Sequence, residues 1–173
     1  MKRMTFATLI VLLMCCGISR AQVNSSLSVD FENPARMSME IDRSVITIGF
    51  TVNDAEGHVA LSSPVTVNIK SNVPWVLSAT VSTDFLGVDN PSNTISCSQL
   101  EFRSRLIGSA ENVLDQQEEY LGFVKNQSLT VARGNATPNE GLHIVNEYRL
   151  KLNLKDPAGR FSLPIMFTLS PSQ

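Results

Sequence analysis

The sequence of 173 residues has few of the residue types on which catalytic and metal sites depend. It contains two histidines, three cysteines and one tryptophan. The histidines, His58 and His143, are far apart, and the chain has no HExxH, CxxC or GxSxG motif. These motifs place zinc ligands, redox cysteines or a serine nucleophile at fixed spacings. We therefore expect a protein that is not an enzyme and that binds no metal or cofactor.

The acidic residues also lack a pattern that indicates chemistry. Glu118, Glu119, Asp84 and Asp89 are predicted to be solvated loop charges, although paired carboxylates from distant strands are not visible in a sequence. The segment Asn53–Gly57 is rich in oxygen donors but lacks the spacing of an EF-hand. A plain Asx turn is the favoured interpretation there, ahead of a calcium loop.

Long apolar runs are confined to the start of the chain. Lys2 and Arg3 precede an uncharged apolar run, Met4–Ile18, which Ser19-Arg20-Ala21 follows as a small-x-small site. The run is shorter than the roughly 20 apolar residues that a membrane-spanning helix needs. The pattern is typical of a signal peptide over residues 1–21 with cleavage after Ala21. We expect an exported protein that is located in the periplasm, on the cell surface or outside the cell.

Two of the three cysteines lie at the end of this apolar run. Lipid attachment at Cys15 or Cys16 is an open alternative, although Met14 is not the small residue that normally precedes such a site. Cleavage after Ala21 removes both cysteines and leaves Cys97 alone, so no disulfide can form within the chain. We expect Cys97 to be a small buried hydrophobic residue, with an intermolecular bridge or a reactive thiol as alternatives.

The charge balance of the mature chain excludes two classes of partner. Loss of Lys2, Arg3 and Arg20 leaves 11 basic and 16 acidic residues, a net charge of −5. An acidic chain is poorly suited to bind nucleic acid or an anionic membrane surface. Residues 22–173 are long enough for one domain with a proper core and contain no linker or repeat. We expect a single domain, with no membrane insertion of the mature chain.

Apolar residues recur at every second position along most of the mature chain. This alternation is the pattern of strands that have one buried face. The alternating segments begin at Leu27, Met37, Ile46, Val65, Trp75, Leu100, Leu129, Tyr148 and Phe161. Residues 109–120 are the one candidate for a helix, and a polar loop is an equal alternative there. The pattern predicts an all-β fold, an antiparallel two-sheet sandwich of the immunoglobulin-like type.

The end of the chain is predicted to form a β-hairpin. Its strands are residues 148–154 and 161–167, and Asp156-Pro157-Ala158-Gly159 between them has the signature of a type I turn. Gly159 is expected to adopt a positive φ. Pro164 has no N–H for a sheet ladder, so its strand is predicted to lie at an edge or to be bulged there.

Two roles are open for the single tryptophan, a residue of the core or a ligand contact. Trp75 is in phase with Leu77, Ala79 and Val81, which predicts that it lies on the core-facing side of its strand. The alternative is an aromatic ring that faces a ligand, as exported sugar-binding modules use.

The segment from Pro74 to Leu169 resembles exported bacterial surface β-sandwich proteins of the WxL and fimbrial-subunit kinds. Trp75-Val76-Leu77 is a literal WxL motif, and the chain closes with the strand FSLPIMFTLS. WxL domains have a second such motif near the C-terminus, where this chain has Phe167-Thr168-Leu169 without a tryptophan. The resemblance implies a role at the cell surface.

The fimbrial resemblance also implies a mode of assembly. Fimbrial subunits of this kind donate an N-terminal alternating segment to the sheet of a neighbour. Gln22–Phe31 fits this description, with Leu27, Val29 and Phe31 as the inserted side chains and Asn33-Pro34 as the break that follows. The alternative is that the segment forms the first strand of its own domain.

These observations favour a structural or adhesive surface subunit with fimbrial-like character. Its partners would be other surface or pilus-like subunits. The alternative is a carbohydrate or cell-wall binding module centred on Trp75, with cell-wall glycan as partner. An exported enzyme is the third hypothesis, and no motif supports it.

Overall fold

The computed structural model describes residues 31–49, 59–107, 112–153 and 155–172. The chain divides into two units, Met1–Asn33 and Pro34–Gln173, and every described strand lies in the second. The predicted signal peptide and the Asn53–Gly57 loop lie outside the described residues. In the described part of the chain, no helix is long and apolar enough to cross a bilayer.

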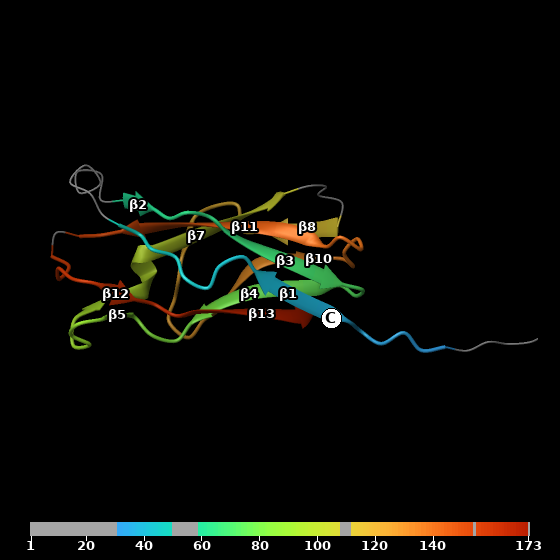
Figure 1. Ribbon diagram of the computed structural model, residues 1–173, viewed down its shortest axis with the longest axis horizontal. Helices are drawn as coiled ribbons and strands as arrows, with labels where there is room; N and C mark the ends of the chain where they lie inside the picture. The colour runs from blue at the N-terminus through green and yellow to red at the C-terminus, as the bar shows by residue number, and fades with distance from the viewer. Residues whose placement is uncertain (1–30, 50–58, 108–111, 154, 173) are drawn as a thin grey trace, which may run out of the picture. The chain divides into compact units, whose positions relative to one another are not determined.

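The strands of the second unit form antiparallel sheets (Figure 1). The first sheet has the order β1 (Met37–Ile41), β3 (Val65–Ser71), β11 (Leu142–Lys151), β7 (Leu100–Ile107) and β9 (Leu121–Gly122), and β2 (Val59–Leu61) also pairs with β11. The second has the order β13 (Ile165–Pro171), β4 (Trp75–Val81), β10 (Ser128–Gly134) and β8 (Val113–Gln116). A small third sheet joins β12 (Phe161–Ser162), β5 (Phe85–Gly87) and β6 (Thr94–Ile95), and η1 (Cys97–Gln99) is a 3₁₀ turn.

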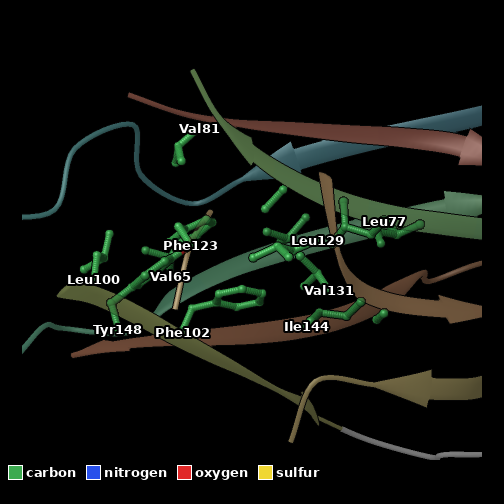
Figure 2. Close-up of a cluster of buried hydrophobic side chains, with 14 of the residues drawn as sticks. Val65, Leu77, Val81, Leu100, Phe102, Phe123, Leu129, Val131, Ile144 and Tyr148 are labelled. Carbon is green, nitrogen blue, oxygen red and sulfur yellow. The ribbon is translucent and has the colours of Figure 1, made fainter. Parts of the chain in front are cut away.

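The core lies between the two larger sheets. Alternate residues of β3 and β4 are buried, as the period-two pattern of their sequences predicts. Figure 2 shows side chains from both sheets meeting in this layer, with the rings of Phe102 and Phe123 stacked 5.0 Å apart between centroids. The prediction of an all-β antiparallel fold with a sandwiched core is confirmed at this level. The immunoglobulin-like strand topology stays a prediction.

The predicted C-terminal hairpin is wrong. Tyr148 of β11 pairs with Phe102 in the first sheet, whereas Phe167 of β13 pairs with Ala79 in the second. The Asp156–Gly159 segment therefore connects two sheets. Each of the two strands has one apolar face, and that face is buried equally well when the strands lie on opposite sides of the core. Gly159 does have the expected positive φ of 146°.

Asp156 shows how the connection between the sheets is held. Its carboxylate accepts hydrogen bonds from the backbone N–H of Asn153 (2.6 Å) and from Nε2 of Gln99 (2.9 Å). The Asp156 N–H donates in turn to the Asn153 carbonyl at 2.9 Å. These bonds connect Asn153 and Asp156 shortly after the end of β11.

Pro164 divides the last apolar segment into two strands. β12 ends at Ser162 and pairs with β5, whereas β13 begins at Ile165 and pairs with β4. β13 is the terminal strand of its sheet in the described topology. The prediction that this strand lies at an edge is confirmed. The strand is also interrupted at Pro164, because proline cannot donate a ladder hydrogen bond.

Residues 109–120, predicted as a helix or a polar loop, instead contain the strand β8. Its residues Val113–Gln116 pair with β10, with Asp115 opposite Arg133. The apolar stripe of this segment is too thin to bury a helix, whereas an added strand satisfies its backbone groups on the edge of β10. The sequence signal for this strand is weak because both faces of it remain partly exposed.

Candidate assembly surface

The sandwich is closed on the side of β7, β8 and β10. The backbone of Gln117 joins the two sheets, because its carbonyl accepts from the Ser104 N–H at 2.6 Å and its N–H donates to the Val131 carbonyl at 2.9 Å. The buried hydroxyl of Ser104 donates to the same Val131 carbonyl at 2.7 Å. Backbone groups along this side are therefore bonded across the gap between the sheets.

The opposite side of the sandwich, between β1 and β13, is only partly covered. β1 and β13 are the terminal strands of the two sheets, and they lie near each other without pairing (Figure 1). Side chains of the adjacent strands, such as Ile69 and Leu77, are 0% exposed. Six apolar residues of these two edges are only half-buried against the same core: Met37, Met39, Leu163, Ile165, Phe167 and Leu169. We call this side of the sandwich the open seam.

The backbone of β13 exposes a free edge along the open seam. The Ser172 N–H donates to the Pro74 carbonyl, and β13 pairs with β4 without a register shift. In an antiparallel ladder, alternate residues bond to the neighbouring strand and the others point away from it. Ile165, Phe167 and Leu169 therefore point their N–H and C=O groups away from β4, while their side chains face the core.

The free edge of β1 has the same character. The Asp42 N–H donates to the Thr66 carbonyl and the Asn72 N–H donates to the Arg36 carbonyl, so the even-numbered residues bond to β3. Met37 and Met39 direct their backbone groups away from β3 and their side chains toward the core. Within the described part of the chain, both edges of the open seam thus combine unpaired backbone groups with incompletely buried apolar side chains, the arrangement that accepts an added strand.

Trp75, the candidate ligand contact, lies in the core and not on a surface. Its side chain is 0% exposed and belongs to the central apolar cluster. A Cβ at Gly134 would lie 2.8 Å from Cζ2 of the ring, so the indole packs directly on the β10 backbone. The indole Nε1 is buried, with no hydrogen-bond partner among the described residues. The ring offers no face to a ligand in this structure.

The candidate donor residues are not tested by the structure. Leu27 and Val29 lie outside the described residues, and Phe31 belongs to the N-terminal unit, where it lies outside any strand. The donor-strand assignment of these three residues stays a prediction.

Cys97 is buried and free, as expected for a small hydrophobic residue. Its Sγ lies 3.8 Å from the Phe123 carbonyl, and burial raises the pKa of its thiol. Its backbone N–H donates to Asp84 at 3.1 Å. Across the described residues, no group of three or more His, Cys, Asp or Glu side chains is placed to hold a metal ion.

Charged side chains gather on the outer face of the first sheet. Glu101 pairs with Arg149 and Lys151, and Glu147 pairs with Arg103 and Arg105. Desolvation raises the pKa of Glu101, but hydrogen bonds from Lys151 and Arg149 outweigh it, so the pKa lies below its ordinary value. Each carboxylate is matched by cations on the neighbouring strand, which is the arrangement of a cross-strand ladder that stabilises the sheet.

The ring of Tyr120 covers the middle of this ladder. The guanidinium carbons of Arg149 and Arg103 lie 4.0 Å and 4.8 Å from the ring centroid. These contacts orient the two arginines over the sheet. Together with the backbone bonds of Gln117, they hold the segment after β8 against the first sheet.

Sequence reasoning predicted the apolar residues of β1 and β13 but assigned them to the core. Alternation shows which side of a strand is apolar, and it does not show whether a further strand covers that side. The signal that was available was Pro164, which marks β13 as an edge strand.

Comparisons with known proteins give distant structural similarity alone. No family model matches the chain, and no curated protein matches it. A solved structure described as a chaperone–tip adhesin complex in CFA/I fimbriae biogenesis contains a similar chain, with a TM-score of 0.44 and 11% sequence identity. The similarity covers 78% of this chain and 42% of that chain, less than half of its length.

Proposed function

We propose that the protein is a non-catalytic, exported structural subunit of a surface assembly. In this proposal the open seam of one copy receives the segment Leu27–Phe31 of another copy as an added strand. The observation that carries the proposal is the open seam itself, where six half-buried apolar side chains adjoin two strand edges that have no partner strand among the described residues. Export and an immunoglobulin-like strand order belong to the proposal as expectations from the sequence.

The spacing of the donor segment suits the seam. Side chains two residues apart in a strand lie on the same face, about 6.8 Å from each other. Leu27, Val29 and Phe31 therefore have the spacing of Ile165, Phe167 and Leu169. Ser28 and Asp30, which alternate with the donor side chains, would face solvent. The inserted strand would bury apolar surface on both edges and bond to the outward N–H and C=O groups of β13.

The carbohydrate-binding alternative stays a prediction, and the burial of Trp75 gives it no support. Trp75 is fully buried, and no other observation in the described residues favours a sugar site. We retain the assembly proposal alone.

The test is the oligomeric state of the full exported chain. Sedimentation velocity across a range of concentrations should show oligomers that persist on dilution. Replacing all three donor side chains by serine (Leu27→Ser, Val29→Ser, Phe31→Ser) should leave monomers, because the apolar insertion is removed. The matched control Ser28→Ala with Asp30→Ala alters only the solvent-facing positions and should assemble like the wild type. Assembly of the triple variant at the wild-type level, or a monomeric wild type, would contradict the proposal.

A further inference from the structure

The chain that follows β1 covers part of the open seam without forming a strand. Ile46 and Ile48 are half-buried against the core, whereas Val45, Thr47 and Gly49 are exposed. The sequence predicts a strand that begins at Ile46, but residues 45–49 have no strand conformation. The side chains thus alternate as in a strand, while the backbone is not paired.

The pairing of β1 is ended by a side chain. The Asp42 N–H makes the last backbone bond to β3, and the Asp42 carboxylate accepts the Thr66 N–H at 3.0 Å. The carboxylate takes the place that a backbone carbonyl of a continuing strand would fill. Among the described residues, positions 43–49 make no backbone–backbone hydrogen bond.

Residues 45–49 lie over one end of the open seam. β1 runs antiparallel to β3 with Met37 opposite Ser71, so β1 starts at the Trp75 end of the sandwich. The chain after β1 continues away from the Trp75 end, and its Ile46 and Ile48 side chains pack against the core. In the view of Figure 2, this chain lies on the same side of the core as Val81. At the Val81 end, Ile165 of β13 pairs with Val81, and no described strand pairs with the outward backbone groups of β13.

We propose that residues 45–49 form a strap that covers the Val81 end of the open seam in the unassembled subunit and leaves when a donor strand pairs with β13. This inference rests on the proposed function, since it concerns the regulation of the same site. The strap buries two isoleucine side chains but leaves the β13 edge without strand partners. An incoming strand covers the same apolar surface and also satisfies that edge, so it displaces the strap. The strap thereby shields the seam from unspecific contacts before assembly and slows capture of a strand.

The first test follows a strap of unchanged sequence while a donor peptide binds. The monomeric Ser-substituted donor variant (Leu27→Ser, Val29→Ser, Phe31→Ser) serves as the acceptor, and a synthetic peptide of residues 25–33 (SSLSVDFEN) serves as the donor. Methyl NMR of isoleucine should show Ile46 and Ile48 moving from core-like to solvent-like chemical shifts as the peptide binds, while Ile69 and Ile144 keep core-like shifts. Bound peptide with Ile46 and Ile48 still in the core would overturn the strap.

The second test measures how strongly the strap competes with the donor peptide for the open seam. In the same acceptor, Ile46→Ala with Ile48→Ala should raise the association rate of fluorescent SSLSVDFEN about tenfold, because the competing state is removed. Thr47→Ala changes an exposed position of the strap and should leave the rate unchanged. Trp75 emission and circular dichroism confirm that each variant is folded. Equal rates in all variants would overturn the strap and leave strand capture intact. Absence of binding in every variant would overturn both the strap and the proposed function.

Discussion

At the scale of single residues, period-two alternation identified the core-facing positions well. Trp75, Leu77, Ala79 and Val81 are all at most 1% exposed, as their shared phase predicts. Cys97 was recognised as buried from its isolation in the mature sequence. The indole Nε1 of Trp75 has no hydrogen-bond partner among the described residues. The sequence could not predict this, because hydrogen-bond partners depend on neighbours that are distant in sequence.

Replacement of Trp75 by alanine should be strongly destabilising. The ring is fully buried and packs on Gly134, so the variant leaves a large cavity. We expect a loss of about 3–5 kcal/mol in the free energy of unfolding, measured by urea titration followed by circular dichroism. Leu86→Ala, at a position that is 40% exposed, is the control and should change stability by less than about 1 kcal/mol. A similar small effect for Trp75→Ala would contradict its placement in the core.

Asp84 should make stability depend on acid pH. The backbone N–H of Cys97 lowers the pKa of this carboxyl, Lys125 lowers it further, and burial opposes both. A carboxyl whose pKa is lower in the folded state stabilises the fold above its unfolded pKa of about 3.9. That contribution is lost as the pH falls through the folded pKa.

The variant Asp84→Asn isolates this effect. Unfolding free energies of the variant and the wild type, measured between pH 7 and pH 2, should differ most near neutral pH and converge at the acid end. If the difference in unfolding free energy does not change with pH, the charge of Asp84 does not contribute to the stability of the fold.

At the scale of elements, the sequence indicates where strands lie better than it indicates which strands pair. β3, β4, β7 and β10 form where alternation is strong. β11 and β13 were predicted as one hairpin because a turn signature lies between them, yet they pair with different sheets. Either sheet can bury the apolar face of such a strand. The sequence of one strand therefore does not show which sheet it joins, and the packing of the whole domain decides this. β8 was missed because its pairing with β10 depends on backbone bonds and not on a buried face.

Gly134 gives a test of packing between β10 and β4. A methyl group there would meet the Asn112 carbonyl and the Trp75 ring, whose Cζ2 lies 2.8 Å from the added carbon. We expect Gly134→Ala to cost about 1–3 kcal/mol in thermal unfolding, as an overpacked core does. Gly49→Ala, where no atom lies within 4 Å of the added carbon, is the matched control. Equal melting temperatures of the two variants would contradict the close approach.

At the scale of the whole molecule, the two sides of the sandwich differ. Backbone bonds through Gln117 close one side, while the terminal strands β1 and β13 leave the other as the open seam. Alternation along each strand could not predict this asymmetry, since it arises from which strands become terminal. The donor segment stays a prediction from the sequence, and its apolar residues have the same two-residue spacing as those of β13.

The most direct test of strand addition at the open seam is residue-resolved amide hydrogen exchange in β13. In the monomeric Ser-substituted donor variant, the amides of Phe167 and Leu169 should exchange fast, because they point away from β4. Those of Met166, Thr168 and Ser170 should exchange slowly, because they bond to β4. When SSLSVDFEN is added, Phe167 and Leu169 should become protected, as a new strand pairs with the edge. Fast exchange at these two amides in the presence of bound peptide would contradict strand addition at the open seam.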